Sequence, residues 1–195
     1  PGYKEKFHDE IKKFAELTNH KSHGFRAPTF SLNNNSSWAI DVLAENNYMY
    51  DSSVVPAKTS LYGLPNAQES PYKISSKNIE KNNSDGIVTE FPLLVTNFLG
   101  KKIPAAGGFY LRSLPTKITK NAIKNYEKQG MPASFYVHSW ELTPEYMPKL
   151  DLPFKDNFAT FHNINDTYKR MNDILEEFEF TSFENYISQG MNLSN

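Results

Sequence analysis

The sequence contains no cysteine among its 195 residues. Disulfide bonds, thiolate nucleophiles and cysteine-ligated zinc are therefore excluded within this chain, although this absence does not fix the compartment. No run approaches the ~18 consecutive apolar residues of a membrane-spanning helix. The net charge of −1 lacks the basic excess that is typical of proteins that bind nucleic acids. We therefore expect no membrane segment in this chain and no nucleic-acid partner.

Aromatic residues are abundant, with 11 tyrosines and 14 phenylalanines. Two interpretations of this abundance are open. Aromatic side chains fill large hydrophobic cores, and their ring faces also pack against sugar rings in carbohydrate-binding clefts.

The hydrophobic pattern predicts helices that alternate with strands. The expected helices cover residues 3–18, 38–45, 115–129, 167–178 and 183–188, and the expected strands cover residues 24–27, 48–51, 72–74, 87–94, 96–99, 133–138 and 180–182. Residues 56–86 form a long excursion with only the short strand 72–74. This alternation predicts an α/β fold with a parallel sheet or barrel, in which catalytic residues gather at the carboxyl ends of the strands.

Three of the expected strand ends carry residues useful in catalysis, namely Arg26, Asp51 and His138. Each alone has a plain structural interpretation: a surface arginine, a turn-forming aspartate and a packed histidine. Together at one mouth of a parallel sheet they would form an acid–base group. A carboxylate would orient the imidazole, and the guanidinium would hold a second carboxylate or a substrate oxygen.

Further candidates lie near these positions. Tyr110 and Arg112 follow two glycines and either line a sugar cleft or pack internally. Trp140 either stacks on the substrate or belongs to the core, and Glu141 either binds a sugar hydroxyl or caps the following turn. His20 and His23 have the spacing of a metal-binding pair, but we expect both to be solvent-exposed, and we expect His162 to be structural.

Five segments in order resemble one known family. They are "GFRAPTFSL", "WAIDVLAENNYMYDSSVVP", "EFPLL", "PAAGGFYLRSLP" and "FYVHSWELTP". They are similar to the polysaccharide deacetylases of carbohydrate esterase family 4, which share the NodB-type homology domain. The branch they resemble most is the one found in bacterial exopolysaccharide gene clusters, which makes the cell envelope or the cytoplasm of a bacterium the expected location.

The resemblance implies a distorted (β/α) barrel that removes N-acetyl groups from polysaccharides or oligosaccharides with one divalent, Zn-type metal held by Asp-His-His. Arg26 matches the arginine that orients the catalytic base. His138 matches the general acid, with Tyr136 where the family has leucine. Asp51 matches the aspartate that holds this histidine, although the Asp-Trp context of the family is absent here.

The family's base aspartate and metal-binding histidines have no match in the chain. We therefore expect residues 1–195 to be a single partial domain, about the C-terminal two-thirds, with the first strands and the metal ligands before Pro1. The isolated fragment would then be inactive or nearly so, and none of its own residues is assigned to the metal. Two alternatives stay open: a non-catalytic glycan-binding or scaffold relative, and a hydrolase of a small cyclic amide.

Overall fold

The structure is a computed structural model that describes residues 2–19, 21–148 and 150–190. The chain divides into two compact units. Unit 1 comprises Pro1–Leu93 with Ser182–Asn195, and unit 2 comprises Leu94–Thr181. None of the described helices has the length and apolar character that crossing a lipid bilayer requires.

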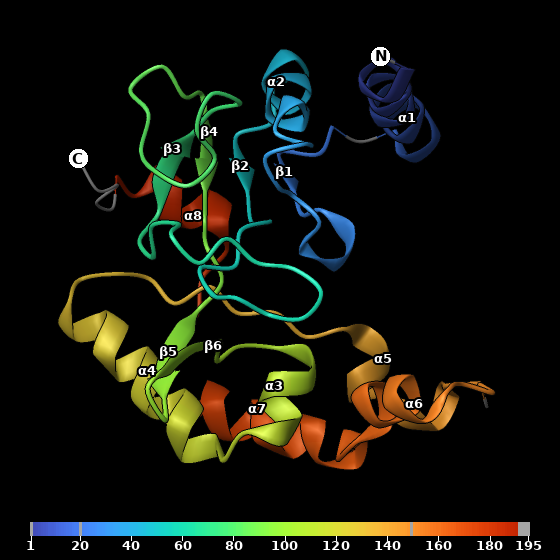
Figure 1. Ribbon diagram of the computed structural model, residues 1–195, viewed down its shortest axis with the longest axis vertical. Coiled ribbons are helices and arrows are strands. Elements are labelled where there is room, and N and C mark those ends of the chain that lie inside the picture. Colours follow the sequence, from blue (N-terminus) through green and yellow to red (C-terminus); the bar gives the residue numbers. More distant parts are fainter. Residues whose placement is uncertain (1, 20, 149, 191–195) are drawn as a thin grey trace. The chain divides into compact units, whose positions relative to one another are not determined.

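Unit 1 is built around a four-stranded sheet (Figure 1). Its strands are β1 (Gly24–Phe25), β2 (Tyr50–Asp51), β3 (Tyr72–Ile74) and β4 (Val88–Glu90), in the order β1-β2-β4-β3. β1, β2 and β4 run parallel, whereas β3 is antiparallel to β4. Because parallel strands end at the same edge, the residues that end or follow β1, β2 and β4 are brought together there.

Three helices accompany this sheet: α1 (Gly2–Thr18), α2 (Trp38–Glu45) and α8 (Phe183–Ser188). The core of the unit is apolar and includes Ile11, Leu32, Ile40, Val42, Leu43, Tyr48, Val54, Tyr72, Ile74, Ile79 and Val88. α8 comes from the far end of the sequence, and its Phe183 ring stacks on Phe91 at a centroid distance of 4.4 Å. The C-terminal helix is therefore part of the first unit.

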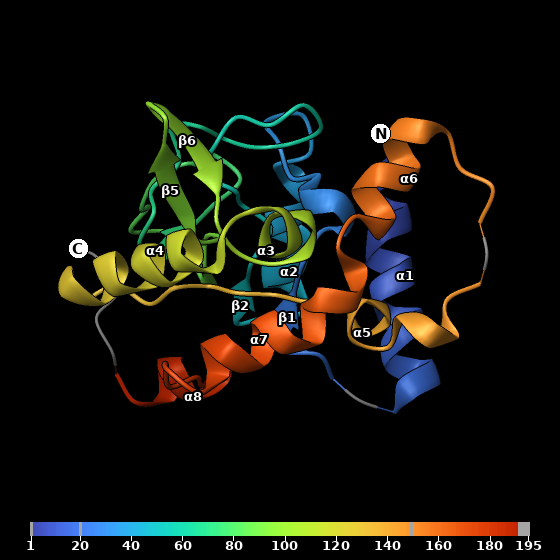
Figure 2. The ribbon, with the colours of Figure 1, turned by 90° about the horizontal axis from the view of Figure 1, so that it is seen from below.

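The described residues of unit 2 combine a hairpin with five α-helices and two short 3-10 helices. The antiparallel strands β5 (Val95–Phe98) and β6 (Lys101–Pro104) are joined by Leu99-Gly100, both with positive φ, as tight hairpin turns require. The helices are α3 (Gly108–Ser113), α4 (Thr116–Lys128), α5 (Ser139–Leu142), α6 (Phe154–Phe161) and α7 (Thr167–Leu175). Figure 2 shows α3 beside α7, in agreement with their close contact.

Most of the expected elements are confirmed with shifted ends, including all five expected helices. In α1, Ile11 is buried, whereas the apolar side chains of Phe14 and Leu17 are exposed. The hairpin strand β6 and the helices α3, α5 and α6 were not predicted.

Two expected strands are wrong. In residues 133–138 only Ser134 is buried and pairs with another segment, through the Leu94 N–H to Ser134 carbonyl bond of 3.1 Å. Phe135, Tyr136 and Val137 are half-buried in an extended segment with no neighbouring strand among the described residues. Residues 180–182 form no strand either. Neither sheet closes on itself within the described parts of the chain, so the barrel stays a prediction.

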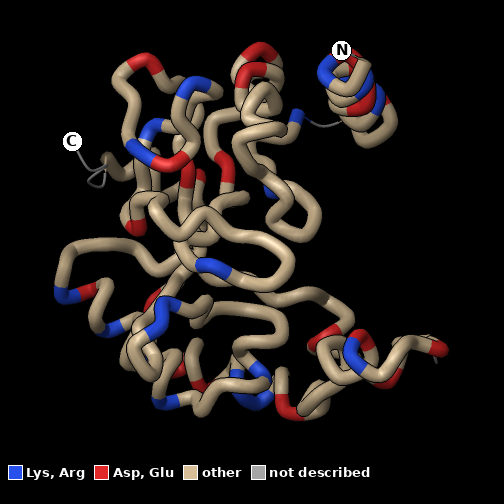
Figure 3. Tube along the Cα trace, viewed as in Figure 1, with Lys and Arg blue, Asp and Glu red and all other residues tan. Residues whose placement is uncertain are grey.

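Charged residues of both signs are interspersed along the chain of each unit, as Figure 3 shows. This pattern agrees with the net charge of −1.

Candidate active site

His138 directly precedes the short helix α5, and Glu141 lies in the first turn of that helix. The Nδ1 atom of His138 is 2.6 Å from Oε2 of Glu141. The same oxygen accepts the backbone N–H of His138 at 3.0 Å. In a capping box, the side chain three residues after the N-cap residue accepts the backbone N–H of the N-cap residue, as Glu141 does here for His138. The local sequence His-Ser-Trp-Glu therefore fixes both the helix start and the imidazole.

Glu141 is completely buried and is held from its other side by Arg112 of α3. The Nε–H of Arg112 donates to Oε1 of Glu141 at 3.0 Å, and the arginine side chain is itself only 2% exposed. Nη1 and Nη2 of Arg112 donate to the carbonyls of His162 at 2.6 Å and of Ala159 at 3.0 Å, at the end of α6. All three guanidinium nitrogens are therefore engaged.

The pKa of the Glu141 carboxyl reflects these partners. Burial alone would raise it, but the hydrogen bonds from His138 and the positive charge of Arg112 outweigh burial and hold the pKa of Glu141 below its ordinary value. Glu141 is therefore an ionised carboxylate at neutral pH.

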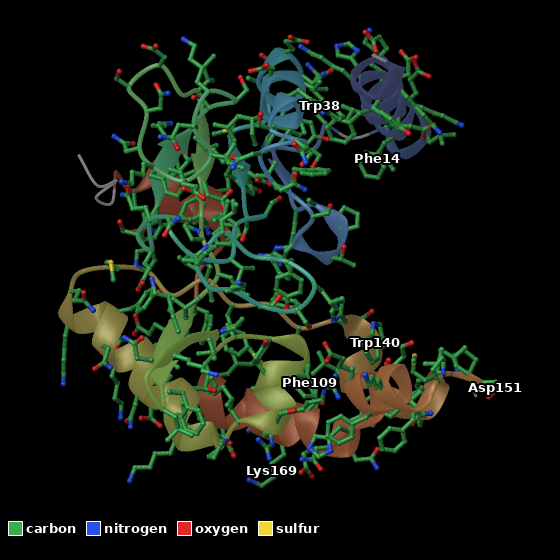
Figure 4. All side chains as sticks on the ribbon, viewed as in Figure 1. Phe14, Trp38, Phe109, Trp140, Asp151 and Lys169 are labelled. Atoms are coloured by element: carbon green, nitrogen blue, oxygen red, sulfur yellow. The ribbon has the colours of Figure 1, made fainter. Side chains whose placement is uncertain are left out.

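The imidazole of His138 is half exposed, with 50% of its side-chain surface accessible. Trp140 stacks on it at 5.3 Å and 21°, and Tyr136 meets it edge-on at 5.2 Å and 87°. Figure 4 shows Trp140 at α5. No hydrogen bond to Nε2 of His138 is formed among the described residues, so this nitrogen is available to an incoming group.

Tyr136 in turn packs against the two glycines that precede α3. Gly107 and Gly108 both have positive φ, at 70° and 48°. A Cβ atom on Gly107 would lie 2.2 Å from the Tyr136 carbonyl oxygen, and one on Gly108 would lie 2.7 Å from the Tyr136 hydroxyl. The glycine pair is therefore needed both for its backbone conformation and for the close approach of Tyr136.

A second polar cluster lies in unit 1, at the edge where β1 and β2 end. The Nε–H and Nη2–H groups of Arg26 donate to the carbonyl and the Oγ of Ser52 at 2.8 and 2.7 Å. Asp51 is completely buried, and its Oδ1 accepts the hydroxyl of Ser53 at 2.7 Å. The sequence correctly placed Arg26 and Asp51 at neighbouring strand ends.

Glu90, which ends β4, was missed as a site residue. It is completely buried and lies opposite Asp51 in the sheet register. Burial, together with the negative charge of Asp51, raises the pKa of Glu90 well above its ordinary value, and burial also raises the pKa of Asp51. A glutamate at the end of an apolar strand was the available signal, since such a residue is rarely buried without a partner.

The structure thus divides the expected site residues between the two units. Arg26 and Asp51 lie in unit 1, whereas His138 lies in unit 2 with Arg112, Trp140 and Glu141. The expected meeting of the two sets stays a prediction. Glu141 is the carboxylate that hydrogen-bonds to the imidazole of His138. The resemblance had assigned this role to Asp51.

The other candidate residues pack against or pair with neighbouring side chains. Tyr110 is half-buried, which raises the pKa of its phenol, and its ring meets Phe109 edge-on at 5.7 Å. His162 stacks on Phe158 at 4.5 Å while its carbonyl binds Arg112. His23 pairs with Glu184 at 3.0 Å. His20 lies outside the described residues.

The resemblance implies a divalent metal held by Asp-His-His. Among the described residues, no group of three or more histidine, cysteine, aspartate or glutamate side chains could hold a metal ion. The described residues therefore do not fit the implied metal centre.

In a comparison with known families, residues 52–188 match the family described as "Domain of unknown function (DUF3473)". The chain belongs to the DUF3473 family. DUF3473 is associated with polysaccharide deacetylase-like proteins. The matched region includes Glu90, Arg112, His138 and Glu141 and begins directly after Asp51. No match was found among curated proteins or among solved structures.

Proposed function

We propose that this DUF3473 chain is part of a metal-dependent polysaccharide N-deacetylase of the carbohydrate esterase family 4 type, and that His138 is its general acid. The observation that carries the proposal is the 2.6 Å contact between His138 Nδ1 and Glu141, which leaves Nε2 available. The association of DUF3473 with polysaccharide deacetylase-like proteins supports the reaction class.

The proposed reaction is the hydrolysis of an N-acetyl amide. Water adds to the acetyl carbonyl carbon, the C–N bond breaks, and acetate and a free amine leave. The departing nitrogen needs a proton, and Nε2–H of an imidazolium supplies it. The Glu141 carboxylate accepts Nδ1–H throughout, so it orients the ring and stabilises its charged form without itself taking the proton.

Arg112 and Glu141 support His138 in this proposal. Contact with sugar was one of two interpretations for each, but both side chains are buried and paired with each other. We therefore assign them a positioning role. Trp140, whose indole stacks on the imidazole, is assigned to the sugar, because ring faces pack on pyranose C–H groups. Tyr110 is assigned to the same cleft on the basis of the resemblance.

A divalent, Zn-type metal would lower the pKa of the attacking water and polarise the carbonyl when bound. The described residues do not fit such a metal. We therefore assign the metal ligands to residues outside those described here, following the order of motifs in the family that the sequence resembles. The substrate class is an N-acetylated polysaccharide or oligosaccharide of the kind that exopolysaccharide clusters process.

The test uses the natural full-length protein, metal-loaded, with an N-acetylglucosamine oligomer as the probe. We expect release of acetate together with an equal amount of free amine. Binding of the oligomer without acetate release would contradict the proposal in favour of a non-catalytic glycan-binding protein. Turnover of a small cyclic amide in place of the oligomer would contradict it in favour of a cyclic amidohydrolase.

A further inference from the structure

Asp51 and Glu90 lie opposite each other on the paired parallel strands β2 and β4, and neither side chain is exposed. In each carboxyl group, one oxygen accepts a hydrogen bond from a hydroxyl or backbone donor. Oδ1 of Asp51 accepts the hydroxyl of Ser53 at 2.7 Å, and Oε1 of Glu90 accepts the backbone N–H of Val54 at 3.0 Å.

Neither second oxygen, Oδ2 of Asp51 or Oε2 of Glu90, has a partner among the N–H and O–H groups of the described residues. Buried polar atoms without a partner are rare, because each costs the desolvation free energy of the group. The two groups are neighbours in the sheet register, and beside burial the negative charge of Asp51 raises the pKa of Glu90. Two carboxylate oxygens are both acceptors, so a bond between them requires a proton.

We propose that Asp51 and Glu90 hold one proton between Oδ2 and Oε2, so that the buried pair carries a single negative charge. Two neighbouring buried carboxylates cannot both ionise without a large electrostatic cost. Sharing one proton removes half of that charge. It also supplies the donor that both unsatisfied oxygens lack.

The surroundings balance a single charge rather than two. Arg26 at the end of β1 is the cation that acts on Asp51. On β3, Tyr72 faces Glu90 in the register and donates its hydroxyl to the carbonyl of Ile79. Lys73 on the same strand binds the Thr89 hydroxyl at 2.9 Å. On α8, Glu184 carries a further negative charge, which acts on Tyr50.

The proton-sharing pair also has a positioning role. Ser53, which donates to Asp51, accepts the backbone N–H of Ala27 at 2.8 Å. Ser52 accepts Arg26 and donates to the Phe91 carbonyl at 2.8 Å. The pair therefore anchors the turn that holds the Arg26 guanidinium. A role of this anchoring in catalysis rests on the proposed function. The shared proton does not depend on the proposed function.

The proton has a predictable effect on stability. Burial raises the pKa of Glu90 in the folded chain above its ordinary value of 4.5, so the unfolded chain releases the proton first as the pH rises. The folded state then binds more protons than the unfolded state, and its stability falls with rising pH above about 4.5. Removal of the carboxyl at position 90 should remove this dependence.

The test is infrared spectroscopy of the metal-free full-length protein in D₂O at pH 7. We expect a carbonyl band of a neutral carboxylic acid in the natural protein and its loss in Glu90→Gln. The control Glu16→Gln, at an exposed position on α1, should retain the band. Glu90→Gln should also flatten the fall in unfolding midpoint between pH 5 and pH 8.

Absence of the neutral-acid band from the folded natural protein would overturn the proposal. A band that disappears on addition of zinc or calcium ions would also overturn it, since a bound cation would then be the native partner of the two oxygens. The band of the natural protein and its pH titration need no substitution, so the test holds even where Glu90→Gln does not fold. Acetate release is not measured, so failure here is distinct from failure of the proposed function.

Discussion

The Oε2 atom of Glu141 accepts both the Nδ1–H and the backbone N–H of His138, at 2.6 and 3.0 Å. A single turn of chain thus sets the direction and the tautomer of the imidazole. The buried guanidinium of Arg112 holds the carboxylate from the other side. The exposed nitrogen of His138 is therefore supported by two buried charges from different helices.

Glu141→Gln should be strongly destabilising. The substitution leaves the buried Arg112 without its counter-charge, which costs about 3–5 kcal/mol in the free energy of unfolding. Denaturant unfolding of both proteins measures this cost. Asp173→Asn, in the exposed pair of Lys169 and Asp173 at 2.9 Å, is the control and should cost less than ~1 kcal/mol. Equal losses for the two variants would contradict the buried pair.

The same pair predicts a pH dependence of stability. The pKa of Glu141 is lowered in the folded state below the ordinary value of 4.5. Its contribution to stability is therefore present above that value and is lost as the pH falls through the lower, folded pKa. Unfolding midpoints of the natural protein and of Glu141→Gln should converge in acid. A difference that stays constant down to the acid limit would contradict the lowered pKa.

Lysine should not be able to replace arginine at position 112. Arg112 reaches three acceptors at 2.6–3.0 Å, and a lysine ammonium cannot meet all of them from one position. We expect a loss of about 3 kcal/mol, because buried acceptors are left unsatisfied. Arg170→Lys is the control, since Arg170 is more exposed, donates to the carbonyls of Leu111 and Leu114 from one nitrogen, and lies 4.0 Å from the exposed carboxylate of Asp166. A smaller loss at position 112 than at position 170 would argue against the clamp.

Gly107→Ala separates steric contact from backbone strain. Gly107 and Gly130 have nearly equal φ values of 70° and 69°, but only at Gly107 would a Cβ meet neighbouring atoms, those of Tyr136. Gly130→Ala should therefore cost about 1 kcal/mol, which is the conformational cost alone. Gly107→Ala should cost several kcal/mol, because Tyr136 must move. Thermal unfolding of both variants makes the comparison, and equal shifts would contradict the close approach.

Sequence reasoning succeeded where the local pattern was sufficient. The helix at Trp38–Glu45 and the strand at Tyr72–Ile74 have the predicted bounds. The short helix at Phe183–Ser188 does as well. Arg26 and Asp51 were placed at neighbouring strand ends because parallel pairing follows from the alternation of helices and strands. The three-residue spacing of His138 and Glu141 is visible in the sequence and suggested that Glu141 caps a turn. It gave no reason to expect a hydrogen bond between the Glu141 carboxylate and the His138 imidazole.

Sequence reasoning failed where the outcome depends on distant partners. An apolar stretch such as 133–138 has the composition of a strand, yet it pairs only at Ser134, since no neighbouring strand extends beside it among the described residues. The burial of Arg112 depends on the carbonyls at the end of α6, about 50 residues along the chain. Glu90 was passed over because its partner, Asp51, is a neighbour in the sheet and not in the sequence.

The central claim is that His138 donates the proton to the leaving amine. Its most direct test is the turnover number of His138→Ala in the metal-loaded full-length protein with an N-acetylglucosamine oligomer. The matched control is His23→Ala, because His23 is 45% exposed and also pairs through Nδ1 with a glutamate, at 3.0 Å. We predict a fall in kcat of about 100-fold or more for His138→Ala, with unchanged metal content, and little change for His23→Ala. A kcat of His138→Ala equal to that of the natural protein would contradict the assignment of His138 as the proton donor.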